Sequence, residues 1–369
     1  MKNSTKTIFS KPSLIILLIF NSSLAFSQSA NADKAKEIAR EAIKLMDRGK
    51  IDSGINLLET AQKLDSKNVS YKYETAYAYH LKKDYERAIG IIEGILDHPN
   101  ASNLFYQLLG NSYDNIDNTV KASEVYTAGL KKFPQSGNLY LELGVVQLQS
   151  NAFENALSYF EKGIEVDPKF PSNYYWAAKL FLSSQDEVWG MIYGELFMNL
   201  ERNSRRTEEI SQLLYNKYAS EVKIINPNSV SVSFCKNGTL SPNDLKFIER
   251  RLPFGPGVYE TTLMMSAVPA TATEINFTYL DYIRTRFVEI YYQLGHHRTY
   301  PNVLFSYQKQ IVEAGNIEAY NHWVLMKGDT NSFEKWHVIN KEKWDKFIIW
   351  FTANPIAVNN ANRFHRNLY

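Results

Sequence analysis

Small and large apolar residues recur at an interval of 34 residues over the first half of the chain. The interval divides this part, without insertions, into four blocks: 35–68, 69–102, 103–136 and 137–170. Positions 8 and 20 of every block are Ala or Gly, and position 24 is always large: Leu58, Ile92, Tyr126 and Phe160. A small side chain lets two antiparallel helices approach closely, and bulky neighbours fill the space around that contact. Each block is therefore predicted to be a helical hairpin.

The third block resembles the consensus of the tetratricopeptide-repeat (TPR) family. The matching residues run through both predicted helices and the turn after them: Leu109, Gly110, Tyr113, Ala122, Tyr126 and Pro134. Proline at the last of these positions cannot continue a helix, so it helps to set the turn into the next block. The resemblance implies a mainly α fold in which helical hairpins stack into a right-handed superhelix.

A fifth block, 171–204, follows the pattern only in part. Ala178 fits it, but Arg202 takes the place of the proline. Residues 205–225 then carry apolar side chains at helical spacing. They predict a helix that caps the open end of the solenoid, as repeat arrays require. We therefore expect a TPR solenoid over 35–204, with four good repeats and one degenerate repeat.

The remaining residues, 226–369, are predicted to be mostly helical and resemble no family. Their first part, 226–269, is punctuated by proline and glycine, which predicts an irregular connector. At most one or two strands are expected in it, one of them where polar and apolar residues alternate over 229–234. The Gly-Pro-Gly run at 255–257 is interpreted as a turn.

Helices are expected to resume with a Thr-x-x-Glu capping box at 271–274, and the helix that follows should end at Gly295. Two shorter helices are predicted within 303–326. A last one is predicted within 340–355, between an N-cap asparagine and a proline.

The N-terminus resembles a secretory leader. Lysines precede a short apolar run, and the small residues Ala25 and Ser27 fit the cleavage rule. We expect cleavage between Ser27 and Gln28, so that 1–27 is a signal peptide and 28–34 a linker. The apolar run is far shorter than the roughly 20 residues that span a bilayer, so no integral membrane segment is expected in the mature chain. The leader and the Lys- and Asn-rich chain indicate a periplasmic or secreted bacterial protein.

The charge balance argues against a nucleic-acid partner. The chain has 41 basic and 39 acidic residues, and three of the lysines lie in the leader. The mature chain is therefore near neutral, whereas nucleic-acid-binding proteins normally carry a clear basic excess.

Candidate chemistry is sparse. The single cysteine, Cys235, lies in an alternating stretch and is interpreted as a small apolar core residue. His296, His297 and Arg298 form the best catalytic or metal candidate, but cations just after a helix also complement its dipole. Phosphate-binding loops, nucleophile elbows and zinc-helix motifs are absent from the sequence. We expect no catalytic residue, no metal site and no cofactor.

The TPR resemblance implies which side chains line the concave groove, because positions 2, 5, 9 and 12 of each first helix face it in that family. These positions supply the predicted partner-binding residues: Tyr73, Tyr77, His80, Leu104, Gln107, Asn111, Leu141 and Val145. Tyrosine and leucine there suit a peptide or a helix of a partner protein. The alternative is that the chain's own C-terminal region covers part of this surface.

The sequence thus favours an exported TPR adaptor, not an enzyme, that holds a partner protein or peptide in its groove. An enzyme with a site within 226–369, which uses the repeats to recruit substrate, is a second hypothesis. A structural component of an envelope assembly is a third. The sequence leaves the oligomeric state open.

Overall fold

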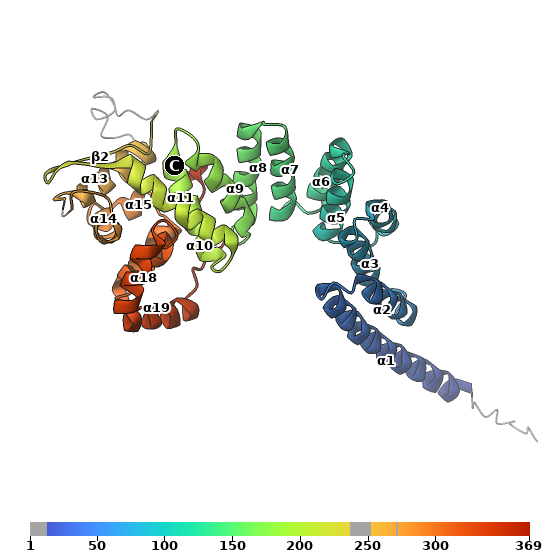
Figure 1. Cartoon of the computed structure of the whole chain (residues 1–369). Coiled ribbons are helices and arrows are strands. Elements are labelled where there is room, and N and C mark those ends of the chain that lie inside the picture. Colours follow the sequence, from blue (N-terminus) through green and yellow to red (C-terminus); the bar gives the residue numbers. More distant parts are fainter. Residues whose placement is uncertain (1–12, 237–251, 271) are drawn as a thin grey trace, which may run out of the picture. The chain divides into compact units, whose positions relative to one another are not determined.

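The computed structural model describes residues 13–236, 252–270 and 272–369, and Figure 1 labels its elements. The chain is mainly α, as predicted, and divides into two compact units, Met1–Lys132 and Phe133–Tyr369. The basic residues of the predicted leader lie outside the described residues. Its apolar part falls within the first helix. No helix in the described part has the length and hydropathy needed to cross a membrane.

The first unit consists of three helical hairpins. They are formed by α1 (Ser13–Asp47) with α2 (Ile51–Leu64), α3 (Ser70–Leu81) with α4 (Tyr85–Glu93), and α5 (Asn103–Asp114) with α6 (Thr119–Lys132). The small residues at positions 8 and 20 lie where the two helices of a hairpin meet. At Gly110 an added Cβ would overlap the ring of Tyr126, so the close approach of α5 and α6 requires glycine there.

Position 15 of each of the four good blocks has a left-handed backbone. The φ angles are 77° at Gly49, 63° at Lys83, 61° at Asp117 and 55° at Asn151. Each of these residues lies in the short turn between the two helices of a hairpin. A left-handed residue just past a helix end reverses the chain direction and lets the next helix begin almost at once. The residue types alone do not reveal this feature, because only one of the four residues is glycine.

The second unit continues the hairpins and then changes character. It begins with α7 (Gly137–Gln149), α8 (Phe153–Val166), α9 (Pro171–Leu182), α10 (Glu187–Leu200) and α11 (Arg205–Glu221). A small antiparallel hairpin follows, made of β1 (Val222–Asn226) and β2 (Ser229–Val232), with Val222 opposite Val232. The helix α11 packs against α9 and α10 and also against α17, so helices of the C-terminal region cover it.

The rest of the second unit is helical. Its elements are the π-helix η1 (Phe254–Glu260), α13 (Thr261–Ala267), α14 (Phe277–Gln293), α15 (His296–Thr299), α16 (Val303–Glu313), α17 (Ile317–Leu325), α18 (Thr330–Ile339), α19 (Lys341–Ala353) and the 3₁₀ turn η2 (Arg366–Leu368). One continuous apolar core extends from Ala156 to Phe364. The fourth and fifth blocks therefore share a core with the C-terminal region.

The predicted connector is wrong over 254–267, which is helical. The Gly-Pro-Gly run lies in the first turn of η1, where proline is tolerated because the first backbone N–H groups of a helix need no partner within it. At Gly255 an added Cβ would overlap the Cys235 sulfur, so this glycine is needed for packing. The rest of the predicted connector, 237–251, lies outside the described residues.

The start predicted for the next helix is also wrong. Thr271 lies outside the described residues, and α14 begins at Phe277 with Asn276 as its N-cap. The Asn276 side chain accepts a hydrogen bond from the backbone N–H of Tyr279 at 3.0 Å, which satisfies one of the free donors at the helix start. The helix ends as predicted, because Gly295 follows it in a left-handed conformation. The helix α18 lies outside the ranges predicted to be helical.

Candidate functional site: an exposed apolar surface on the first unit

Among the side chains that the structure describes, four large apolar ones are exposed on the first helices of the three hairpins in the first unit. They are Ile43 on α1, Tyr77 and Leu81 on α3, and Leu104 on α5, and we call them the exposed apolar positions. Tyr77 is 39% exposed and Leu104 is 46% exposed. Both were predicted to face a partner, whereas Ile43 and Leu81 were missed. Ile43 lies at position 9 of its block, as Tyr77 does, so the repeat register could have identified it.

The other predicted aromatic residue of α3, Tyr73, packs within the unit. Its ring stacks on Phe105 of α5, with centroids 4.9 Å apart and planes 16° apart. Burial raises the pKa of the Tyr73 hydroxyl to about 12, and nearby Glu74 and Tyr77 act in the same direction. Tyr73 therefore joins successive hairpins and presents less surface to a partner than Tyr77 does.

Two predicted polar residues also make hydrogen bonds between helices. The His80 ring nitrogen Nδ1 lies 2.9 Å from the Ser112 hydroxyl, and burial lowers the pKa of His80. Asn111 accepts a hydrogen bond from the Tyr126 hydroxyl at 2.6 Å. These contacts connect α3 to α5 and α5 to α6, so both side chains are partly committed to the repeat structure. Gln107, also predicted, is half-buried on α5.

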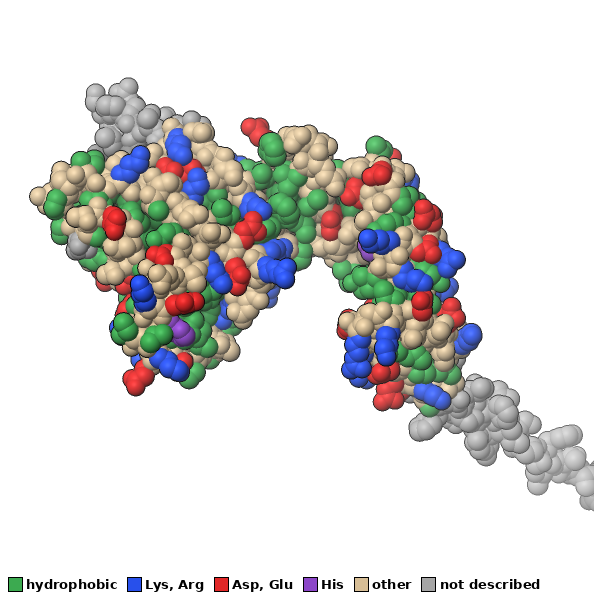
Figure 2. All heavy atoms as spheres, in the orientation of Figure 1, with side chains coloured by type: hydrophobic (Ala, Val, Ile, Leu, Met, Phe, Trp, Pro, Cys, Tyr) green, Lys and Arg blue, Asp and Glu red, His purple; other side chains and the backbone are tan. Residues whose placement is uncertain are grey.

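The remaining predicted residues, Leu141 and Val145, belong to the second unit. Both lie half-buried on α7 and pack against the large core of that unit. Figure 2 shows an apolar region over α7 and α8. Six of the eight predicted residues thus belong to the first unit, and two belong to the second.

The histidine pair lies against tyrosine rings. His297 stacks on Tyr292 with centroids 4.5 Å apart, and His296 packs at 5.7 Å from Tyr291. Burial lowers the pKa of His296. Within the described residues, no group of three or more His, Cys, Asp or Glu side chains is placed to hold a metal.

Cys235 is buried beside a carboxylate. Its backbone N–H donates a hydrogen bond to Glu260 Oε1 at 2.7 Å. Burial, reinforced by the charge of Glu260, raises the pKa of the thiol well above its usual value. Because the thiolate is the reactive form of cysteine, this environment suits a packing residue better than a nucleophile.

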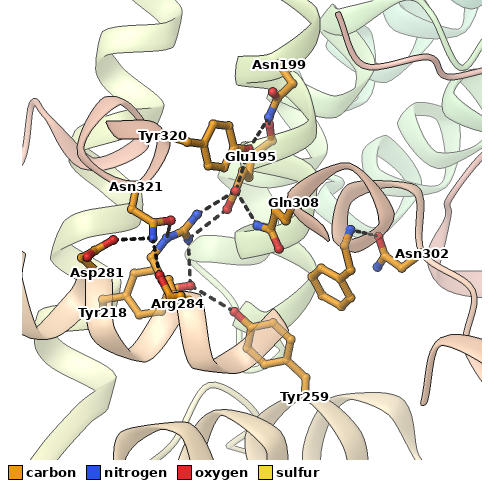
Figure 3. Close-up of polar contacts among 12 residues, drawn as sticks. Glu195, Asn199, Tyr218, Tyr259, Asp281, Arg284, Asn302, Gln308, Tyr320 and Asn321 are labelled. Carbon is orange, nitrogen blue, oxygen red and sulfur yellow. Dashed lines mark hydrogen bonds and ion pairs between the residues drawn. The ribbon is translucent and has the colours of Figure 1, made fainter. Parts of the chain in front are cut away.

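A polar cluster lies in the interior of the second unit (Figure 3). Arg284 of α14 and Glu195 of α10 form a doubly hydrogen-bonded ion pair, with N–O distances of 2.7 and 3.0 Å. Tyr320 and Gln308 donate to the same carboxylate, at 2.8 and 2.6 Å. Asn321 accepts from Arg284 Nε at 2.9 Å. The pair is thus almost completely satisfied by protein groups.

A cavity of about 20 Å³ lies beside this pair, which is room for about one water molecule. The cluster joins the fifth block to the C-terminal helices, because α14, α16 and α17 all bond to the Glu195 carboxylate of α10. This cluster was not predicted from the sequence. Its one signal was Glu195 in the middle of a helix that is otherwise strongly apolar.

The comparisons with known proteins agree with the repeat pattern. A family model described as "Tetratricopeptide repeat" matches residues 39–102 and 108–173. BBSome complex member BBS4 of Bos taurus is 26% identical over 144 residues, which cover 39% of this chain and 27% of that protein. Tetratricopeptide repeat protein 21A of Mus musculus is 27% identical over 120 residues, covering 31% of this chain and 9% of that protein. The chain therefore spans about a quarter or less of the length of these curated relatives.

Similar solved structures include pilF of Pseudomonas aeruginosa, at 17% identity and a TM-score of 0.42, covering 50% of this chain and 83% of that one. Another is TTC0263, a thermophilic TPR protein of Thermus thermophilus, at 14% identity and a TM-score of 0.41. It covers 49% of this chain and 98% of that chain.

Proposed function

We propose that this chain, whose residues 39–102 and 108–173 match tetratricopeptide repeats, is an exported adaptor that binds a partner protein or peptide through the exposed apolar positions of its first unit. The repeat family supports a role in protein–protein interaction. Export, the surface used and the absence of catalysis are all part of the proposal.

The observation that carries the proposal is the exposure of Tyr77 and Leu104 on first helices. Large apolar side chains lose free energy of about 25 cal/mol per Å² when they are transferred out of water, so a partner that covers them gains affinity. Tyrosine is also among the residues that dominate binding energy at interfaces. Their neighbours Tyr73, His80 and Asn111 are fixed by contacts between helices, which holds the surface in shape before binding.

Export is compatible with the core of the first unit. The buried residues of α1 begin at Ala35 and continue through Ala39, Ala42 and Met46. Cleavage between Ser27 and Gln28 leaves all of them in the mature chain. Removal of the leader therefore removes no buried residue from the described core of the first hairpin.

The proposal is tested by placing a photo-crosslinking amino acid at Tyr77 or at Leu104 in the exported full-length chain. The matched control site is Val120 on α6, which is 74% exposed and belongs to the second helix of a hairpin. We expect the same partner protein to be crosslinked from Tyr77 and from Leu104, but not from Val120. The Tyr77→Ser/Leu104→Ser variant should capture at least about tenfold less of that partner.

Absence of any adduct from Tyr77 and Leu104, or the same set of adducts from Val120, contradicts the binding surface. Adducts between two copies of this chain would support the envelope-assembly hypothesis instead. A photo-crosslinker at His297 provides a further comparison, because a partner captured only there would direct attention to the C-terminal region.

A further inference from the structure

An apolar hollow lies in the second unit, at the start of α8 and the end of α9. Its volume is about 510 Å³, within the range of about 300–1,000 Å³ that is typical of binding pockets. Phe153, Leu157, Leu180 and Phe181 form its apolar wall. Phe153 is the first residue of α8 and is 55% exposed, an unusual environment for phenylalanine in the described part of the chain.

The rim of the hollow is held in place by hydrogen bonds. The Ser184 hydroxyl donates to the Phe181 carbonyl at 2.8 Å and accepts from the Asp186 backbone N–H at 3.0 Å. The segment after β2 also reaches this rim, because the Lys236 backbone N–H donates to the Gln185 carbonyl at 2.8 Å. The hollow is therefore formed before any partner arrives, which lowers the entropy cost of binding.

This rim is the point where the fifth block departs from the other four. Position 15 of the fifth block is Gln185, and its backbone is not left-handed, unlike that of Asn151 and its equivalents. The turn between α9 and α10 is instead held by backbone hydrogen bonds to the segment that contains Cys235 and Lys236. The degenerate repeat thus has a turn of a different kind, and this turn forms the rim of the hollow.

The charges at the hollow have one sign. Glu154 and Asp186 line it, and no basic side chain among the described residues does. Glu154 is exposed and forms no ion pair with any described residue. The guanidinium of Arg366 lies over the Phe181 ring, but it is bonded to Glu161. Arg366 also acts electrostatically on Asp186, so Glu154 is the rim carboxylate that is available to a positive charge.

We propose that this hollow docks a partner segment in which an apolar side chain is followed closely by lysine or arginine. The apolar side chain enters between Phe153 and Leu180, and the cation meets Glu154 at the rim. Complementary charges at the edge of an apolar contact provide specificity and speed association. This site lies on the second unit and does not depend on the exposed apolar positions of the first.

The test uses fluorescein-labelled synthetic hexapeptides and the full-length mature chain. One peptide contains tryptophan followed by lysine, a second has glutamate in place of the lysine, and a third has serine in place of the tryptophan. Fluorescence anisotropy is measured at protein concentrations up to the millimolar range. We expect the tryptophan–lysine peptide to bind at least about tenfold more tightly than either of the others, because one of these lacks the aromatic anchor and the other brings a negative charge to the acidic rim.

Two variants locate the binding site. Phe153→Ser should weaken the tryptophan–lysine peptide at least about tenfold, and Glu154→Lys should reverse the preference between the lysine and glutamate peptides. Val120→Ser, which removes an exposed apolar side chain at the start of the equivalent helix of the preceding repeat, should change nothing. Both Phe153 and Glu154 are exposed, so the variants are expected to fold, and circular dichroism verifies this.

The proposal is overturned if no peptide binds in this concentration range, or if the three peptides bind equally. It is also overturned if Phe153→Ser has no effect while Tyr77→Ser/Leu104→Ser abolishes binding. That last result would place the peptide on the first unit and leave the proposed function standing.

Discussion

Arg284 of α14 and Glu195 of α10 form a buried ion pair across 89 residues of sequence, and each side chain is only 5% exposed. Removing both charges from water costs several kcal/mol, and their attraction and hydrogen bonds have to offset this cost. Such a pair is tolerated in only one relative position of the two helices, because any shift leaves a buried charge without a partner. It therefore selects how the C-terminal helices dock on the fifth repeat.

Replacing Arg284 by methionine should destabilise the second unit by about 3–5 kcal/mol, because Glu195 then remains buried without its partner. Urea unfolding followed by tryptophan fluorescence measures this directly, since all six tryptophans lie in the second unit. The control is Lys341→Met, which removes an exposed pair with Asp345 and should cost less than about 0.5 kcal/mol. Equal effects of the two substitutions would show that the buried pair does not determine docking.

Gly110→Ala should destabilise the first unit by about 1–3 kcal/mol, because the new methyl group overlaps the Tyr126 ring. Gly90 is a matched control, since it lies within α4 and an added Cβ there meets nothing within 4 Å. Gly90→Ala should stabilise the unit by about 0.5–1 kcal/mol through better helix propensity. Unfolding of the first unit is measured as the urea transition that changes the circular dichroism but not the tryptophan fluorescence, because the first unit has no tryptophan. A neutral Gly110→Ala would contradict the packing of α5 on α6.

Lys83→Gly should stabilise the first unit by about 1 kcal/mol, because a left-handed backbone is unfavourable for lysine and freely adopted by glycine. The reverse change at the equivalent turn, Gly49→Ala, should cost about the same amount. An added Cβ at Gly49 meets nothing within 4 Å, so this effect is purely conformational. Thermal melts of the two variants should therefore shift in opposite directions. Shifts of the same sign would mean that the turns are not left-handed in solution.

The second unit should lose stability as the pH falls through about 6.5. His322 stacks 3.9 Å from Trp336, and its Nδ1 lies 2.8 Å from the Glu318 carbonyl. Burial lowers the pKa of His322 below its usual 6.5, so the folded state stays neutral where the unfolded chain binds a proton. Acid therefore favours unfolding.

His322→Phe keeps the ring stack and should reduce this loss between about pH 7.5 and about pH 5.5, measured by urea unfolding with tryptophan fluorescence. Burial also lowers the pKa of His365, so part of the loss should remain in this variant. An identical pH dependence in the wild type and in His322→Phe would exclude His322 as a contributor.

Export should remove the leader. Edman sequencing or intact mass of the mature protein should place its first residue at or within a few residues of Gln28. The matched variant is Ala25→Leu, which breaks the small-residue rule at the cleavage site and should leave the leader attached. A mature protein that retains Met1 would contradict the export part of the proposed function.

The repeats could be predicted from sequence because their main contacts are local. Gly110 meets Tyr126 only 16 positions later, within one hairpin, so the spacing of small and large residues records that contact. The same locality places Asn340 at the start of the last predicted helix, as in the structure, although its side chain makes no capping hydrogen bond there. A helix that follows a cap and a periodic apolar face needs little information from the rest of the chain.

The binding surface could be predicted only in part. The register placed Tyr73 and Tyr77 on the same side of α3, which is correct for a helix. Which of them stays exposed depends on Phe105 in the next hairpin, which stacks on Tyr73 and leaves Tyr77 open. The exposure of Phe153 was not predicted, because the sequence alone does not distinguish an exposed phenylalanine at a helix start from a core residue.

By itself, the sequence determined the mainly α fold, the 34-residue repeats and the positions of most helices, because these follow from side-chain size and spacing along one or two helices. Only the tertiary structure decided which residues remain exposed and how the C-terminal region docks. Glu195 and Arg284 are ordinary charged residues in isolation, and their pairing depends on two helices meeting from far apart in the chain. Burial is a property of the whole packed molecule, so no local pattern of residues could specify it.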